Sequence, residues 1–131
     1  MTKKITKTFL RSEETMRKYF EFSQKVKEGK EKSDFDTDLE KIAIKKFKYW
    51  MIIENKFPYD VIADISHMLL PIRKVAFNWD LLSREERDEL EELKKTYIQE
   101  NYDVIYENTV RGMTIPKWFH LHLLVLKREE I

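Results

Sequence analysis

The feature that most limits how this chain can fold is an apolar run near its C-terminus. Residues 118–126 read Trp-Phe-His-Leu-His-Leu-Leu-Val-Leu, and the two histidines are the only strongly polar side chains in the run. A run of this kind predicts a strand that is buried on both faces of a sheet. Because side chains alternate between faces along a strand, we expect His120 and His122 to point to one side, which Trp118 shares.

The other elements are predicted from the spacing of apolar residues and from residues that begin or end helices. They are a helix over 12–28, strands over 48–54, 65–72 and 104–107, and a helix from Ser83 to near Asn101. Gly29 is placed to end the first helix, and Ser83 with Glu86 forms a capping-box pattern at the start of the second. Residues 39–47 fit both a helix and a strand, and their pattern leaves the two open.

Composition excludes several kinds of chemistry. The only glycines are Gly29 and Gly112, whereas a dinucleotide fingerprint or a P-loop needs several glycines close together. The absence of cysteine excludes a disulfide scaffold, a thiolate metal site and a cysteine nucleophile. The 25 basic and 24 acidic residues give a net charge of +1, which excludes a uniformly basic nucleic-acid binder but not a local basic patch.

Two histidines side by side in an apolar strand have three explanations. They can be core histidines with satisfied hydrogen bonds, or metal ligands with His67 as a third ligand. They can also serve nucleophilic catalysis, in which a neutral imidazole attacks phosphorus while a neighbour fixes its tautomer. Spacing alone leaves all three open.

Residues 118–124 resemble the signature of the histidine-triad (HIT) family, His-φ-His-φ-His-φ-φ, where φ is apolar. The match puts Trp118 at the first histidine position, His120 at the middle one and His122 at the third. Residues 50–59, 66–75 and 80–86 and the pair Glu107-Asn108 are similar to further family segments in the same order. The resemblance covers about residues 42–127.

The resemblance implies an α+β fold, with an antiparallel sheet, a long helix packed on it, and often a second identical subunit. We therefore expect one globular unit made of a charged helical extension over 1–38 and a HIT-like domain over 39–131. The implied function is hydrolysis or transfer at the α-phosphate of a nucleotide conjugate, such as a dinucleoside polyphosphate or a phosphoramidate. The implied partners are a nucleotide or its conjugate and a second copy in a homodimer. No resident metal or cofactor is implied, although Mg²⁺ accompanies the substrate in some branches.

Carried over by position, the resemblance makes His120 the nucleophile and His122 the neighbour that orders the site and binds phosphate. The substrate-binding positions that it implies are Asn55 at the ribose, and His67, Asn108 and Thr114 near the phosphates. Phe57 is our candidate for contact with the base, and Trp118 is assigned to the substrate site as the replacement for the first histidine. An indole donates one hydrogen bond but cannot accept or relay a proton, so Trp118 is the main departure from the family pattern.

The alternative function is a catalytically weak module of the same fold that binds a nucleotide or RNA. A basic N-terminal arm could also meet RNA, although nothing specific in the sequence supports RNA as a partner, and a solvated helix is the simpler interpretation. No apolar stretch approaches the ~20 residues of a membrane span, and no signal-peptide core follows the basic N-terminus. We expect a cytoplasmic protein that does not associate with membranes.

Overall fold

The computed structural model describes residues 9–113 and 115–131, so the predicted contact of Thr114 lies outside the described residues. Its centre is a five-stranded sheet in the order β1-β2-β3-β5-β4, in which every neighbouring pair is antiparallel. The strands are β1 (Lys45–Lys46), β2 (Trp50–Glu54), β3 (Ala63–Pro71), β4 (Val104–Tyr106) and β5 (Leu121–Leu126). Together with the helices described next, this sheet confirms the predicted α+β class.

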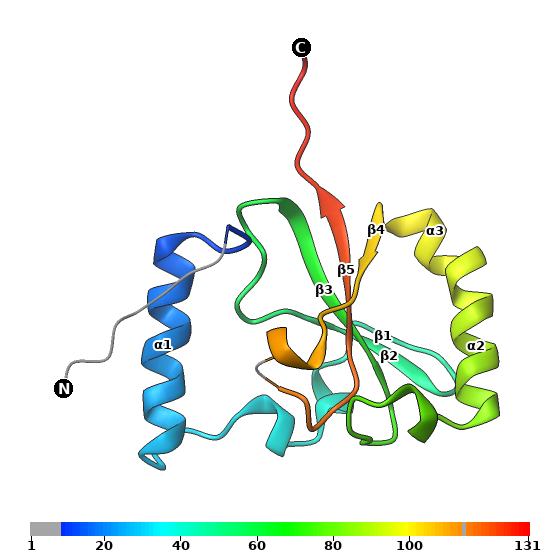
Figure 1. Cartoon of the computed structure of the whole chain (residues 1–131), viewed down its shortest axis with the longest axis horizontal. Coiled ribbons are helices and arrows are strands. Elements are labelled where there is room, and N and C mark those ends of the chain that lie inside the picture. The colour runs from blue at the N-terminus through cyan, green and yellow to red at the C-terminus, as the bar shows by residue number, and fades with distance from the viewer. Residues whose placement is uncertain (1–8, 114) are drawn as a thin grey trace.

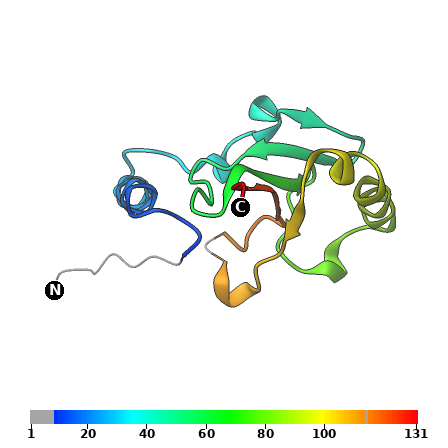
Figure 2. The same cartoon turned by 90° about the horizontal axis from the view of Figure 1, so that it is seen from above.

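The α-helices stand on opposite sides of the sheet, with α1 on one side and α2 and α3 on the other (Figures 1 and 2). Their bounds are α1 (Glu13–Lys27), α2 (Arg84–Lys95) and α3 (Tyr97–Asn101), and short 3-10 helices occupy Asp34–Asp36, Leu39–Ile42, Trp79–Leu81 and Val110–Gly112. The first helix is confirmed, with Ser12 as its N-cap and Gly29 at φ 74° just beyond its end. Glycine adopts this left-handed conformation without steric cost, which explains why the helix stops there.

Two predicted elements need correction, and the alternative left open over residues 39–47 is decided. The helix predicted from Ser83 to Asn101 is interrupted at Thr96, whose φ of −122° and ψ of −98° leave the helical region. Residues 39–47 contain both a 3-10 turn and the short strand β1. The strand predicted over 118–126 begins only at Leu121, because the N–H of Phe119 donates to the carbonyl of Val75 instead of joining the sheet ladder (2.6 Å).

One face of the sheet is packed against α2 and α3. Its buried side chains include Trp50, Ile52, Leu69, Phe119, Leu121 and Leu123, which meet Leu90, Leu93 and Ile98 from the helices. The predicted capping box is confirmed, since Ser83 and Glu86 each accept the other's backbone N–H. The Glu89 carboxylate also accepts the N–H groups of Tyr49 (2.8 Å) and Trp50 (3.1 Å), which ties α2 to the start of β2.

The opposite face carries a second apolar cluster and both C-terminal histidines. The cluster contains Met51, Ile53, Met68, Leu70 and Trp118 from the sheet region, covered by Phe35 and Leu39. In the register of β3 with β5, Met68 lies opposite His122, whereas His67 lies opposite Leu123. His122 therefore belongs to the face of Met68, and His67 belongs to the face covered by α2 and α3.

Helix α1 is attached to the rest of the fold mainly at its N-terminal end. The Asp60 carboxylate accepts hydrogen bonds from Ser12 N (2.8 Å), Ser12 Oγ (2.6 Å) and Thr15 Oγ1 (2.8 Å). No residue of α1 is fully buried, so the helix is held beside the sheet rather than packed into its core. Within residues 9–113 and 115–131, no helix is long and apolar enough to cross a membrane.

Candidate functional site

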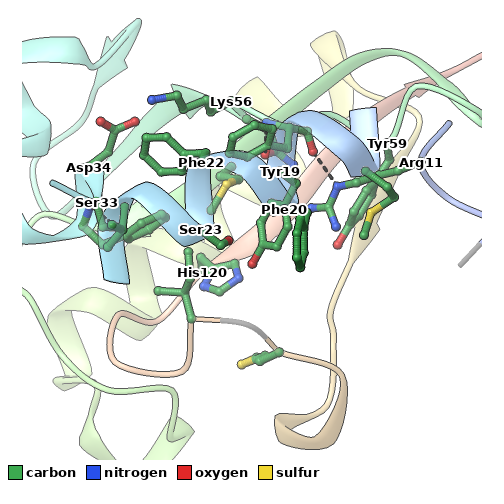
Figure 3. A pocket seen from close by; sticks show the side chains of 18 of the residues that line it. Arg11, Tyr19, Phe20, Phe22, Ser23, Ser33, Asp34, Lys56, Tyr59 and His120 are labelled. Atoms are coloured by element: carbon green, nitrogen blue, oxygen red, sulfur yellow. Dashed lines mark hydrogen bonds between the residues drawn. The ribbon is translucent and has the colours of Figure 1, made fainter. Parts of the chain in front are cut away.

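A cavity of about 610 Å³ lies between α1 and the face of the sheet that carries the histidines. Its border is built from α1 and the turn after β2, together with Asn108, Gly112, Met113, Ile115, His120 and His122. Figure 3 shows Arg11, Tyr59 and His120 on this border, with aromatic side chains of α1 beside them. The volume is within the ~300–1,000 Å³ typical of pockets for small ligands.

The His120 imidazole is held in a single tautomer. Its Nδ1 lies 2.9 Å from the carbonyl oxygen of Trp118, and because a carbonyl only accepts, Nδ1 must carry the proton. Nε2 then has a free lone pair, and it has no hydrogen-bond partner among the described residues. Burial lowers the pKa of His120, and the bond to Trp118 opposes that shift only in part. The ring is therefore neutral at pH 7 and borders the cavity with an unprotonated nitrogen.

His122 is fixed by a chain of hydrogen bonds from two other segments. Asn108 Nδ2 donates to the Tyr59 hydroxyl oxygen (3.0 Å), which leaves the phenolic proton to be donated to His122 Nε2 (3.2 Å). The proton of His122 is then on Nδ1, which is buried without a partner. Burial, with the nearby His120 and Arg11, lowers the pKa of His122 to about 3. His122 is thus a neutral, immobilised neighbour of His120, with the two ring centroids 5.3 Å apart.

Asn55 and Phe57 lie on the cavity border, in the turn after β2. Asn55 Oδ1 accepts the N–H of Phe57 (3.1 Å), while Asn55 Nδ2 is buried and has no partner. The Phe57 ring packs edge-on against Tyr19 of α1, with the centroids 5.0 Å apart. The turn therefore places Asn55, whose Nδ2 has no partner among the described residues, and an aromatic surface at the border of the same cavity.

Two residues proposed from the sequence lie elsewhere. His67 is on the other face of the sheet, where its Nδ1 hydrogen-bonds with the Tyr102 hydroxyl (2.7 Å). Because it is separated from His120 and His122 by the sheet, it cannot complete a metal site with them. Trp118 is 5% exposed, does not border the cavity, and donates its indole N–H to the carbonyl of Pro71 (3.0 Å). Trp118 therefore lies in the core and not on the border of this cavity.

The structure adds two residues that we did not predict. Tyr59 is buried, and it links Asn108 to His122. Arg11 lies before α1, outside the segment that resembles the family, and its guanidinium carbon lies over the Tyr59 ring at 4.6 Å. Neither position carries a local sequence signal, because the hydrogen bonds of Arg11 to Phe57 and of Tyr59 to His122 span 46 and 63 residues of chain.

No protein-family model matches this sequence, and no curated protein matches it. Among solved structures, the chain is similar to a protein described as "Hit Like Protein", with 13% identity and a TM-score of 0.46 over 63% of this chain and 83% of that one. It is also similar to a HIT family hydrolase from Legionella pneumophila Philadelphia 1, with 18% identity and a TM-score of 0.43 over 76% of this chain and 87% of that one.

Proposed function

We propose that this protein is a divergent histidine-triad enzyme, which binds a nucleotide conjugate in the cavity and transfers its nucleotidyl group through His120. The observation that carries this proposal is the hydrogen bond from His120 Nδ1 to the Trp118 carbonyl, which leaves Nε2 unprotonated at the cavity. A nucleophilic imidazole needs this tautomer and a neutral ring. Most buried side-chain polar atoms have a hydrogen-bond partner, so the unpartnered Nε2 of a buried histidine at a cavity supports a role beyond packing.

The reaction would proceed in two displacements. The lone pair of His120 Nε2 attacks the α-phosphorus, an N–P bond forms, and the bond from phosphorus to the leaving group breaks with its electron pair. The leaving group departs as an anion or takes a proton from water. A water oxygen then attacks the same phosphorus, the N–P bond breaks, and the water proton passes to solvent. The products are a nucleoside monophosphate and neutral His120.

Unpaired donors around the cavity favour a ligand rich in oxygen acceptors. Within residues 9–113 and 115–131, Asn55 Nδ2 and His122 Nδ1 are buried without hydrogen-bond partners, and both residues border the cavity. Leaving a buried donor unsatisfied costs about 1–3 kcal/mol, so an acceptor supplied by a ligand would recover that free energy. Phosphate and ribose oxygens are acceptors of this kind. Mg²⁺ would enter only with the substrate, and we assign no residue of this chain to it.

Trp118 supports a second candidate function, a nucleotide-binding module with little or no catalysis. The position that holds the first imidazole in the family pattern is here a core indole bonded to Pro71, so it has no proton to offer a leaving group. The two candidates make the same prediction for binding and opposite predictions for turnover.

Incubation with a panel of substrates distinguishes the enzyme from the binding module. Purified wild type would be incubated with adenosine and guanosine phosphoramidates, dinucleoside polyphosphates and nucleotide sugars, with release of nucleoside monophosphate as the readout. His120→Ala should abolish turnover, while His67→Ala, a matched histidine on the other face of the sheet, should retain it. A covalent adduct of one nucleotidyl group in the wild type, detected by mass spectrometry and missing from His120→Ala, would support the intermediate.

Three outcomes of this experiment would count against the proposed enzyme or against the assay. Turnover that survives His120→Ala would remove His120 from its role. Binding of nucleotides without turnover of any panel member would favour the module. Loss of turnover in His67→Ala equal to that in His120→Ala would show that the readout follows stability and not chemistry.

We also propose that the protein is a cytoplasmic homodimer. Strand β4 is at the edge of the sheet, and its Val104 and Ile105 side chains are 36% and 37% exposed. An edge strand with exposed apolar residues is a surface on which another chain can pair. Light scattering after gel filtration would test this, since a mass of one chain at micromolar concentration would contradict the dimer. Cell fractionation would test the location, since recovery outside the cytoplasmic fraction would contradict it.

A further inference from the structure

We propose that Arg11 is the residue that binds a substrate phosphate in the cavity, so that the N-terminal segment is part of the site. This inference rests on the proposed function and deepens it. Arg11 lies before the part of the chain that resembles the family, and it reaches the cavity from the side of α1 (Figure 3). The segment whose purpose the sequence left open would then supply the cation that binds the phosphate.

The position of the Arg11 guanidinium is set by three contacts that use only part of it. Its Nε donates to the carbonyl of Phe57 (2.6 Å), and its Cζ lies over the rings of Tyr59 (4.6 Å) and Tyr19 (5.5 Å). Among the described residues, no partner accepts from Nη1 or Nη2 of Arg11. Four N–H bonds of a positioned, half-buried cation are therefore available to a ligand.

The two histidines at the cavity carry no charge, so a phosphate bound there needs a cation from another part of the chain. His120 and His122 are both neutral at pH 7, because burial lowers their pKa values, so neither offers a positive charge to a phosphate. The chain also lacks the glycine-rich loop that would surround a phosphate with backbone N–H groups. The acidic residues on the border, Asp34 and Glu54, form no ion pair with Arg11 within the described residues. A guanidinium that forms no ion pair and lies near neutral imidazoles is suited to bind an anion and not a cation.

The other cations on the border are less suited to the role. Lys27 and Lys56 are exposed, and the Lys56 ammonium is placed over the Phe22 ring at 3.8 Å. Arg11, in contrast, is half-buried and precedes Ser12, whose backbone and side chain are both fixed by Asp60. This fixation reduces the conformational entropy that Arg11 would lose on binding a ligand.

Calorimetric titration of the full chain tests the assignment. The probes are adenosine, guanosine and their 5′-monophosphates, at pH 7.5 and fixed salt. Arg11→Ala should weaken binding of the monophosphates by about ten- to a hundredfold, the effect of losing one or two charge-assisted hydrogen bonds. It should change binding of the nucleosides less than about twofold, because they have no phosphate. Arg11→Lys should fall between Arg11→Ala and wild type, since it keeps the charge and loses the paired donors.

Arg17→Ala is the matched control. Arg17 is exposed on α1, the helix that follows Arg11, and pairs with Glu13 (2.7 Å), so its loss should alter neither class of ligand. Thermal unfolding of each variant would show that the fold is retained, and Arg11→Lys keeps the test valid if Arg11→Ala is unstable.

The outcomes distinguish this inference from the proposed function. Equal weakening of nucleosides and monophosphates by Arg11→Ala and Arg11→Lys would show a structural role and overturn the inference. Monophosphate binding that neither Arg11 variant changes would also overturn it, while leaving the proposed function in place. If the wild type binds neither nucleosides nor monophosphates, both the proposed function and the inference fail.

Discussion

His120 donates its Nδ1–H to the carbonyl oxygen of Trp118, two residues earlier in the same chain, over 2.9 Å. The first residue of the triad-like run therefore acts through its backbone and not through its side chain. Its indole is turned into the core, where it bonds to Pro71. The tautomer of the proposed nucleophile thus does not depend on which side chain occupies position 118.

The first prediction concerns the pH dependence of activity. Burial lowers the pKa of His120 below 6.5, and only the neutral form is a nucleophile. We expect kcat/KM for the best panel substrate to be constant from pH 7 to 8 and to fall to half its maximum only below pH 6.5. A stopped assay from pH 5 to 9 would measure this. An acid limb with its midpoint above pH 7 would contradict the tautomer and charge assigned to His120.

The second prediction concerns stability at acid pH. The imidazole of His122 takes up a proton near pH 6.5 in the unfolded chain but only near pH 3 in the folded one. The unfolded state therefore binds more protons between these values, and the free energy of unfolding falls as the pH falls through this window. Urea unfolding should show His122→Gln losing less stability than wild type between pH 6 and pH 5, by about 1 kcal/mol. Identical losses in the two proteins would show that His122 is not buried in its neutral form.

The third prediction tests the hydrogen-bond chain through Tyr59. Tyr59→Phe keeps the ring beneath Arg11 but removes the hydroxyl that joins Asn108 to His122. Two polar groups lose a partner, so we expect the free energy of unfolding to fall by about 1–2 kcal/mol. Tyr106→Phe is the matched control, because Tyr106 packs on the same ring and its hydroxyl forms no hydrogen bond within the described residues. Equal effects of the two substitutions in urea unfolding would contradict the chain.

The fourth prediction concerns restoration of the triad pattern. Trp118→His creates the three-histidine sequence, but position 118 lies in the core cluster with Met51, Met68 and Leu70 and does not border the cavity. We expect no gain in turnover and a loss of stability of about 3 kcal/mol, from the lost volume and the lost bond to Pro71. Panel turnover and urea unfolding would measure both. A rise in turnover would show that the residue 118 side chain can reach the substrate.

Much of the local structure could be predicted from the sequence because its causes are local. Gly29 ends α1 by its backbone conformation, and Ser83 with Glu86 caps α2 within four residues. The apolar runs predicted strands β2, β3 and β5, although β5 begins three residues later than expected. That boundary depends on a contact between Phe119 and Val75, which no local pattern contains.

The candidate site also combines features that the sequence predicts with features that depend on the fold. His120 and His122 reach one cavity because they are two residues apart in one segment, a relationship that is visible in the sequence. His67 lies on the opposite face because the register pairs Met68, and not His67, with His122. A shift of one residue exchanges the two faces of a strand, and only the pairing of whole strands decides it. Tyr59 and Arg11 join the site through contacts across 63 and 46 residues of chain.

Periodicity and caps are properties of neighbouring residues, so the sequence by itself determined the elements and the histidine pair. The sheet face of His67, the tautomer of His122 and the position of the Arg11 charge depend on distant segments that meet only in the folded chain, so the tertiary structure alone decided them.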